Sequence, residues 1–177
     1  MHSKGASALR EALATARLAY SGDHLEVAMT MQSVAYAAQL AGEYAVADSL
    51  YSAAIAMHRR LGVPSPDNLA GALSDRGTLL FDQGSAPEAE PLMLEAIGIK
   101  QSLGDTTTRA YAVLLSNLGP VLLRLGRSAA AESVYQQALA IRTRLQGEDH
   151  LDVSYTLNNL AFVHMERGDL TGAESLF

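Results

Sequence analysis

The sequence predicts an all-α fold built from antiparallel helical hairpins, and an internal repeat together with helical periodicity carries this prediction. Four glycines recur at an interval of forty-two residues: Gly42, Gly84, Gly126 and Gly168. A period of this length is typical of solenoids in which each repeat is one supersecondary unit. Around each glycine, apolar residues stand three and four apart, which indicates amphipathic helices. Each unit is therefore predicted to be two helices joined by a turn at the glycine.

Small residues recur at fixed places in both helices of the predicted hairpin. In the first helix they are Ala35, Gly77, Gly119 and Ala161, and in the second they are Ala47, Ala89, Ala131 and Ala173. Two antiparallel helices approach closely only where one side chain is small, and larger residues fill the remaining space. These positions are therefore expected to form the helix contacts of every repeat.

The repeat register divides the chain into elements. We expect one solenoid domain over residues 1–177, with a half-repeat helix at 5–20, full repeats at 23–64, 65–106 and 107–148, and a truncated repeat at 149–177. The expected helix pairs run near 25–41 and 43–61, 67–83 and 86–103, 108–125 and 128–146, and 151–167 with 170–177. Polar residues that follow a helix stop are expected to cap the first helices. The N-cap candidates are Asp23, Ser65, Thr107 and Asp149.

Composition and charge restrict the classes of function. Hydrophobic residues make up 49% of the chain, aromatic residues 6% and charged residues 18%, which favours helices that pack through small side chains. The formal net charge is −6 and the sequence pI is about 5.3, so no basic surface for nucleic acid or an anionic membrane is expected. The absence of cysteine excludes disulfides and cysteine-ligated zinc.

The hydropathy pattern gives no sign of a membrane protein. Charges interrupt the apolar residues near the start of the chain, which a signal peptide would not tolerate. No apolar run approaches the length of a membrane span. We therefore expect a soluble, cytoplasmic protein.

The last repeat contains the most specific stretch of the pattern. Residues 149–161 read Asp-His-Leu-Asp-Val-Ser-Tyr-Thr-Leu-Asn-Asn-Leu-Ala. The preceding predicted helix supports the pattern with Ala131-Glu132, Tyr135, Ala138-Leu139 and Ile141-Arg142. Together they resemble the tetratricopeptide repeat family, in particular its 42-residue variety found in kinesin light chains and many bacterial regulatory proteins. The resemblance covers nearly the whole chain.

The resemblance implies a right-handed superhelical solenoid whose first helices line a concave groove that binds peptides or partner proteins. Carried over residue by residue, it gives these candidates for peptide binding: Gln32, Tyr36, Asp75, Phe81, Asn117, Arg124, Tyr155, Asn158, Asn159 and Phe162. Further positions expected to face the groove are Met29, Ser33, Gln39, Ser74, Thr78, Asp82, Val113, Ser116, Leu123 and Glu166. Asparagine amides donate and accept at once, which suits the backbone of an extended ligand. Exposed aromatic rings supply contact area at low entropic cost.

The chain departs from the family pattern at several positions. Its only lysines are Lys4 and Lys100, so the clamp for a terminal carboxylate found in chaperone-binding relatives is not expected. Arg76 takes a position that is apolar in the other repeats, and we expect it to pair with Asp75 or Asp82. Pro120 lies inside a first helix, where the loss of a backbone hydrogen bond predicts a kink.

Other candidate sites have simpler structural interpretations. Arg167-Gly168-Asp169 spells an adhesion tripeptide but aligns with the hairpin turns of the other repeats. The histidines lack metal-ligand spacing, so no metal site is expected. Asp75 and Asp82 have no histidine or nucleophile partner, so an acidic recognition patch fits them better than a catalytic acid pair. Acids that recur with the repeat are expected to be structural or solvated charges: Glu90, Glu132 and Glu174.

These features predict a protein-interaction scaffold that binds a protein or peptide in its groove, without catalysis and without a cofactor. Two alternatives stay open. One is a regulatory or sensor segment of a larger bacterial signalling enzyme, such as a kinase or a protease. The other is a structural segment that associates with itself through the apolar faces at the exposed ends of a truncated solenoid.

Overall fold

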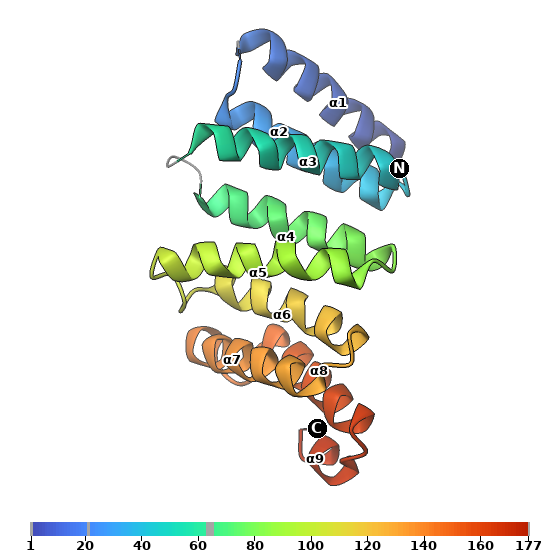
Figure 1. Ribbon diagram of the computed structural model, residues 1–177, viewed down its shortest axis with the longest axis vertical. Helices are drawn as coiled ribbons and strands as arrows, with labels where there is room; N and C mark the ends of the chain where they lie inside the picture. The colour runs from blue at the N-terminus through green and yellow to red at the C-terminus, as the bar shows by residue number, and fades with distance from the viewer. Residues whose placement is uncertain (1, 21, 63–65, 177) are drawn as a thin grey trace. The chain divides into compact units, whose positions relative to one another are not determined.

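The computed structural model describes the backbone of residues 2–20, 22–62 and 66–176, and their side chains from residue 11 onward (Figure 1). The regular secondary structure of these residues is helical, without a strand. The chain forms two compact units, residues 1–84 and 85–177. The first unit contains α1 (His2–Ala19), α2 (Leu25–Leu40), α3 (Tyr44–Leu61) and α4 (Pro66–Asp82). The second contains α5 (Ala86–Ser102), α6 (Arg109–Arg124), α7 (Ser128–Gln146), α8 (Leu151–Glu166) and α9 (Leu170–Glu174).

The observed helices confirm the hairpin pattern. From α2 to α8, each helix begins and ends within one residue of its expected range, while α1 begins at His2 and α9 ends at Glu174. Within each unit, helices that follow one another in the chain pack together (Figure 1). The most extensive contacts join α2 to α3 and α6 to α7. These two pairs are the hairpins on either side of the glycine turns.

The hairpin turns need glycine because of their backbone conformation. Gly42, after α2, has a φ of 77°, in the left-handed region where a side chain is strained. The next N–H, of Glu43, donates to the carbonyl of Ala38 at 2.8 Å. This bond adds to the one that the same carbonyl accepts from the N–H of Ala41 at 3.1 Å and closes the end of the helix. The same arrangement recurs at Gly126, so the glycine spacing marks a backbone requirement of the turn.

The N-caps of α2, α6 and α8 lie one residue after the predicted positions. They are His24, Thr108 and His150, whose side chains accept first-turn N–H groups at 3.2, 3.3 and 3.1 Å. The predictions of Asp23, Thr107 and Asp149 are therefore wrong by one residue, and Ser65 lies outside the described residues. Two of the caps are histidines, which accept through Nδ1, whereas Ser, Thr, Asp and Asn dominate this position in proteins.

Asp23 has a different role, because it binds the end of α3. Arg60 donates to both oxygens of its carboxylate, at 2.5 and 2.8 Å. This hydrogen bonding holds the pKa of Asp23 below its ordinary value. The residue that precedes the cap of α2 therefore ties the start of α2 to the last turn of α3.

One of the core clusters of the first unit packs around Tyr51 of α3. Its ring is fully buried and belongs to a cluster with Ala35, Ala38, Ala47 and Leu79. The alanines of α2 let the ring approach the helix closely, as the small residues in the sequence predict. The core of this hairpin therefore alternates one large residue with several small ones.

Arg76 joins α4 to α3. Its Nε donates to Oδ1 of Asp48 at 2.8 Å, and its side chain is partly buried. The expected pairing with Asp75 or Asp82 is therefore wrong, since the arginine is directed toward α3 and not along its own helix. A charge at this otherwise apolar position is accommodated because the preceding helix supplies a carboxylate.

In the second unit, the ring of Tyr135 on α7 lies directly against the backbone of α6. A Cβ on Gly119 would lie 2.1 Å from Cζ of this ring, so only glycine fits. Tyr135 is buried, and burial raises its pKa to about 12. The following residue, Pro120, lies inside α6, which is helical from Arg109 to Arg124. The kink expected at Pro120 stays a prediction.

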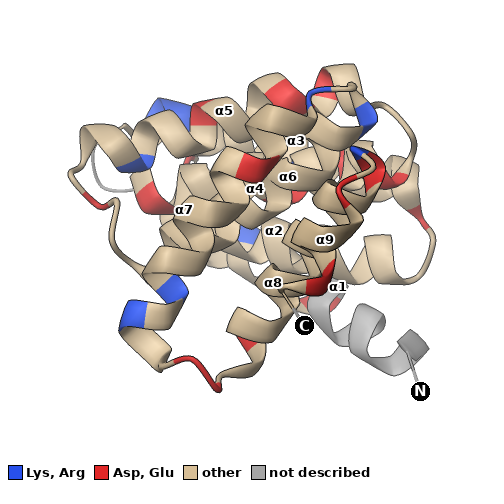
Figure 2. Ribbon diagram, turned by 90° about the horizontal axis from the view of Figure 1, so that it is seen from below, with Lys and Arg blue, Asp and Glu red and all other residues tan. Residues whose placement is uncertain are grey.

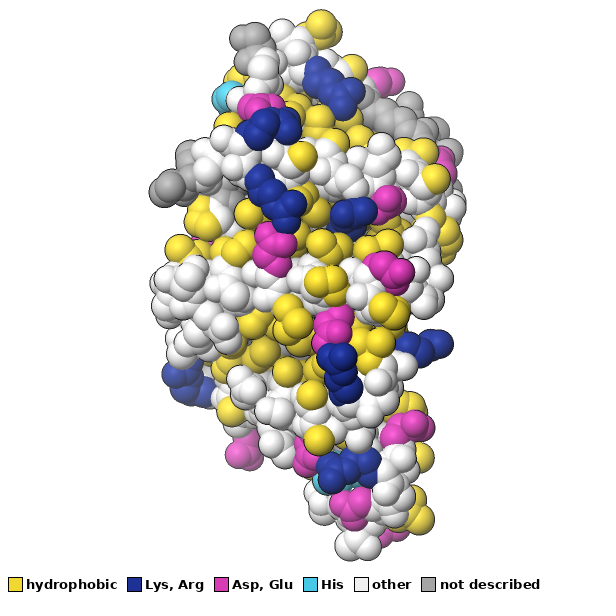
Figure 3. All heavy atoms as spheres, viewed as in Figure 1, with side chains coloured by type: hydrophobic (Ala, Val, Ile, Leu, Met, Phe, Trp, Pro, Cys, Tyr) yellow, Lys and Arg dark blue, Asp and Glu magenta, His cyan; other side chains and the backbone are white. Residues whose placement is uncertain are grey.

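Acids on the second helices pair with the turns of the following hairpins. Glu90 of α5 pairs with Arg127, and Glu132 of α7 pairs with Arg167, so their structural interpretation is confirmed. Figure 3 shows such oppositely charged side chains next to each other, among exposed hydrophobic ones. Arg167 is also the C-cap that follows α8, and Gly168 comes next with a φ of 76°. The adhesion-like tripeptide is therefore a hairpin turn.

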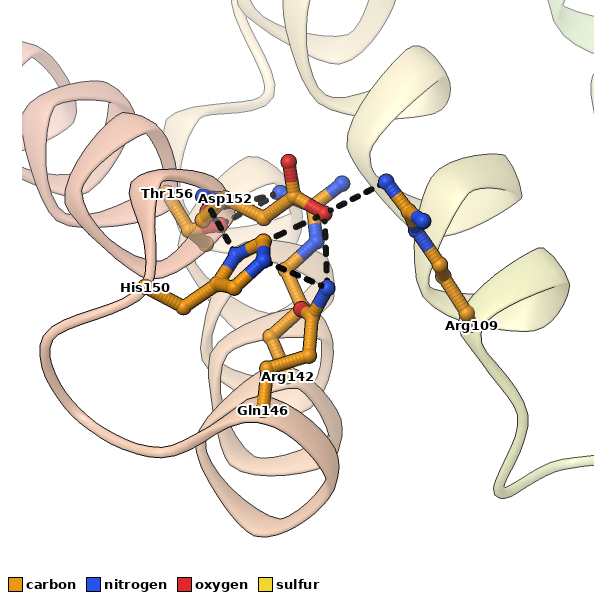
Figure 4. A network of polar contacts seen from close by, with 6 residues as sticks. All are labelled: Arg109, Arg142, Gln146, His150, Asp152 and Thr156. Atoms are coloured by element: carbon orange, nitrogen blue, oxygen red, sulfur yellow. Dashed lines mark hydrogen bonds and ion pairs between the residues drawn. The ribbon is translucent and has the colours of Figure 1, made fainter.

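A polar network joins α7 to the start of α8 (Figure 4). Arg142 is 8% exposed, and its Nη1 donates to Oγ1 of Thr156 at 2.5 Å and to the carbonyl of Asp152 at 3.2 Å. The carboxylate of Asp152 accepts from Gln146 at 3.0 Å and pairs with Arg109 of α6 at 3.1 Å. The bond from Gln146 is the main cause that lowers the pKa of Asp152, whereas burial lowers that of Arg142.

Replacing Gly119 with alanine should lower the free energy of unfolding by about 1–3 kcal/mol, because the new methyl group overpacks against the Tyr135 ring. The matched control is Gly98→Ala on the exposed side of α5, where a Cβ meets nothing within 4 Å. The control should raise stability by about 0.5–1 kcal/mol through helix propensity. Urea unfolding followed by circular dichroism measures both. Equal effects of the two substitutions would show that the Gly119 contact does not restrict packing.

Arg142→Ala should lower the free energy of unfolding by about 1.5–3 kcal/mol, because it removes charge-assisted hydrogen bonds from a buried site. Arg144→Ala is the control on the same helix, since Arg144 is exposed and donates to the carbonyl of Thr107 at 2.9 Å. Its loss should change stability by about 0.5 kcal/mol or less. Denaturant titrations of the two variants test this difference, and a cost at Arg144 as large as that at Arg142 contradicts the argument from burial.

Candidate partner-binding faces

The first helices of the hairpins keep a face that remains open to solvent. In the first unit this face lies on α2 and α4, which contact each other. The predicted binding residues here are Gln32, Tyr36, Asp75 and Phe81, which define the α2–α4 face. Tyr36 is 57% exposed, Asp75 is exposed, and the other two are half-buried. All four side chains are therefore accessible to a ligand.

Hydrogen bonds orient Gln32 of the α2–α4 face and Gln39, which is also on α2. The hydroxyl of Tyr51, on α3, donates to Oε1 of Gln39 at 3.3 Å, and Nε2 of Gln39 donates to Asp82 of α4 at 3.0 Å. Oε1 of Gln32 lies 3.0 Å from Nε2 of the buried His58. These bonds fix the orientation of both glutamines, so the polar groups of this face are positioned before any ligand arrives.

Asp75 forms no ion pair or hydrogen bond with another described residue. The neighbouring Arg76 is directed to Asp48 instead. Although Asp75 is exposed on its open side, the surrounding protein removes part of the hydration of its carboxylate, and this burial raises its pKa to about 6. Burial also raises the pKa of Tyr51, to which Asp75 and then Tyr36 contribute electrostatically. The carboxylate of Asp75 and the ring of Tyr36 therefore both act electrostatically on the Tyr51 hydroxyl.

The second unit has a corresponding face on α6 and α8. It contains the other six predicted binding residues, which define the α6–α8 face: Asn117, Arg124, Tyr155, Asn158, Asn159 and Phe162. Tyr155 is 57% exposed and Phe162 is 51% exposed. Arg124 and Asn158 are also exposed, and Asn117 and Asn159 are half-buried. Whether these residues bind a ligand stays a prediction, but their accessibility permits it.

The structure adds two residues to the α6–α8 face. Leu151 is 62% exposed and Met165 is 53% exposed, at the two ends of α8. With Tyr155, Asn158 and Phe162 they form one stripe with steps of four, three, four and three residues. This spacing places them on the same side of the helix, and extending the helical periodicity in both directions would have found them.

Two serines expected on the open faces lie deeper than predicted. Ser74 is only 3% exposed, so its placement in the groove is wrong. Ser116 is half-buried, and its hydroxyl oxygen is buried without a hydrogen-bond partner among the described residues. Both occupy the register position of Gln32, whose longer side chain reaches outward. A short side chain at this position stays within the packed layer.

Lys100 and two of the histidines have structural partners. Lys100 is buried and pairs with Asp105, so it is not available on either face. His58 is buried beside Gln32, and His164 lies 2.7 Å from Asp169. In the part of the chain that the structure describes, no three acidic or histidine side chains are arranged to hold a metal ion. No helix there is long and apolar enough to cross a membrane.

A separate hollow lies in the first unit between α1, α2 and α3. Its volume is about 490 Å³, and its walls are mainly apolar, with Leu13, Val34 and Leu50 among the lining residues. Arg17 is its charged residue. The hollow contains none of the predicted binding residues and no network of oriented polar groups, in contrast to the α2–α4 face.

Helical hairpins with a 42-residue period place this chain in the class of helical-repeat solenoid proteins. The family model of the tetratricopeptide repeat matches residues 68–144 and 110–177, and the chain belongs to this family. Repeats of this family typically serve as scaffolds for protein interactions. No curated protein matches the chain in sequence.

Solved structures of similar fold confirm the helical solenoid. BtubC (BKLC) from P. vanneervenii is 24% identical with a TM-score of 0.88, and the match covers 99% of this chain and 70% of BtubC. A Podosopora anserina protein with nearly identical TPR-like repeats, provisionally assigned as a kinesin light chain, is 15% identical with a TM-score of 0.81, over 99% and 83% of the two chains. The apo form of RapI is 18% identical with a TM-score of 0.78, over 97% of this chain and 45% of RapI.

Asp75→Asn should stabilise the chain at pH 7.5 and leave its stability unchanged near pH 4. A raised pKa of about 6 means that the folded state disfavours the charged carboxylate, so the wild-type chain loses stability as the pH rises from the ordinary value of 3.8 through 6. Asparagine does not ionise and avoids this loss. Because Asp75 keeps contact with water, the effect should be smaller than the full pKa shift implies. Denaturant titrations of both proteins across this pH range test it, and a difference independent of pH contradicts it.

Proposed function

We propose that this chain is a protein-interaction scaffold that binds a peptide or a partner protein through its α2–α4 and α6–α8 faces. The observation that carries the proposal is the exposure of large aromatic rings on helices, namely Tyr36, Tyr155 and Phe162. Exposed rings on a rigid support supply contact area with little loss of side-chain entropy, and such residues often dominate the binding energy of interfaces. The tetratricopeptide family supports the same role.

The polar groups between the rings suit a peptide ligand. Asn117, Asn158 and Asn159 carry amides that both donate and accept hydrogen bonds, as the backbone of an extended segment does. The apolar stripe on α8 would take large side chains of the same segment. Recognition would therefore combine sequence-independent hydrogen bonds with a few aromatic or aliphatic anchors.

The charge distribution favours a protein partner over nucleic acid. Most of the ribbon in Figure 2 is uncharged, and the sequence carries a net charge of −6. Binding to a phosphate backbone depends on clustered Lys and Arg, and several arginines of this chain are engaged by its own carboxylates. We propose a cytoplasmic scaffold that needs neither a metal nor a cofactor and has no catalytic role of its own.

The experiment compares two double variants of equal helicity. Tyr155→Ala/Phe162→Ala removes the rings of the α6–α8 face, and Val46→Ala/Leu94→Ala removes exposed apolar side chains from the second helices. Proteins captured from a lysate of the organism that encodes the chain are quantified by mass spectrometry. The leading partner is then purified for calorimetric titration. The face variant should bind at least about thirtyfold more weakly, since an aromatic hot spot contributes about 2 kcal/mol or more.

The control variant should keep the affinity of the wild-type chain. If Tyr155→Ala/Phe162→Ala binds as the wild-type chain does and Val46→Ala/Leu94→Ala loses binding, the partner binds the second helices and the proposal for α8 is wrong. Tyr36→Ala, measured in the same titration, tells whether the α2–α4 face contacts the same partner.

A further inference from the structure

One register position of the first helices runs through all four repeats, and it carries a charge in only one of them. The position is occupied by Ser33, Asp75, Asn117 and Asn159. The three neutral residues are small and polar, and two of them are asparagine, which has the same shape as aspartate. The repeat fold therefore does not require a carboxylate here. The charge at Asp75 needs another explanation.

The chain does not neutralise Asp75, although it neutralises many of its other acids. Among the described residues, carboxylates on loops and second helices pair with a basic side chain: Asp23, Asp48, Glu90, Asp105 and Glu132. Asp75 has no such partner. The sequence of α2 contains no Lys or Arg, and the single basic residue of α4, Arg76, is bound to Asp48.

The surroundings of Asp75 suit a cation from outside. Tyr36, on the same face, has a ring that is 57% exposed, and an aromatic face attracts Lys and Arg head groups. The protein around the carboxylate removes part of its hydration, which strengthens an ion pair compared with one in open solvent. Gln39 donates to one oxygen of Asp82 at 3.0 Å, whereas Asp75 accepts no hydrogen bond from a described residue.

We propose that Asp75 selects partners that place a lysine or arginine side chain on the α2–α4 face, with the cation on the carboxylate and the aliphatic stem along Tyr36. This inference rests on the proposed function and names the chemistry of the ligand at one position. A charge-assisted hydrogen bond accounts for the selectivity, because an uncharged side chain of the same shape would leave the carboxylate without a counter-charge.

The probes are short peptides that are capped at both ends and otherwise uncharged. One carries a central arginine, a second carries citrulline as the neutral analogue of arginine, and a third carries glutamate. Each is titrated into the isotope-labelled chain, and the resonances of Tyr36 and Asp75 report binding at this face. The arginine peptide should bind at least about tenfold more tightly than the citrulline peptide, and the glutamate peptide should bind most weakly. The preference for arginine should decrease as salt is added.

Asp75→Asn is the decisive variant, and it should fold because the chain carries asparagine at Asn117 and Asn159. Circular dichroism checks its helicity. It should bind the arginine and citrulline peptides equally, whereas Asp82→Asn, the control on the same helix, should keep most of the preference. A preference that survives Asp75→Asn, equal binding of both peptides to the wild-type chain, or no response of Tyr36 to any peptide overturns the inference. The capture experiment with the α8 variants does not depend on Asp75, so the proposed function stands or fails separately.

Discussion

The close approach of helices at small residues is the constraint on which the rest of the structure depends. Tyr51 and Tyr135 are large, buried and placed on second helices, and each packs against a first helix where the chain supplies alanine or glycine. A helix pair can be this close only if its large and small residues alternate in register. The 42-residue period keeps that register from one hairpin to the next. The same register therefore determines which face of each first helix stays open.

The division of each first helix into two faces explains how one fold can combine a rigid core with an open surface whose residues differ from repeat to repeat. Residues on the inner face are constrained by volume, as Gly119 shows. Residues on the outer face contact few neighbours, so Tyr36 and Phe162 can be large without affecting the packing. The hydroxyl of the buried Tyr51, on a second helix, donates to Gln39 and so orients a side chain of the open face. The open surface is in this way separated from the folding core but oriented by it.

The sequence predicts the fold almost completely because the repeat samples the same local pattern several times. Helix bounds, glycine turns and small contact residues all follow from periodicity. Details that depend on where one side chain points do not follow. The pairing of Arg76 with Asp48 could be predicted only from the packing of α3 against α4. The N-cap at His24 depends on how far an imidazole ring reaches, which residue propensities do not describe.

For the binding faces, the family register placed all ten candidates on accessible positions, because the repeat geometry fixes the side of the helix. It missed Leu151 and Met165, which lie at helix ends where the register alone does not say how far the open face extends. It also put Ser74 on the surface, since position in the repeat does not reveal that a short side chain stays within the packed layer. The unpaired state of Asp75 is visible only once Arg76 is seen to point elsewhere.

The packing of each helix against its neighbours in the chain has a consequence for how the protein is made. Contacts between successive helices require no distant segment to be present, so the entropy lost in closing loops is small and folding is expected to be fast. A hairpin such as α2–α3 can form its core as soon as both helices have left the ribosome, before the second unit is synthesised. The order of synthesis and the order of assembly can then be the same.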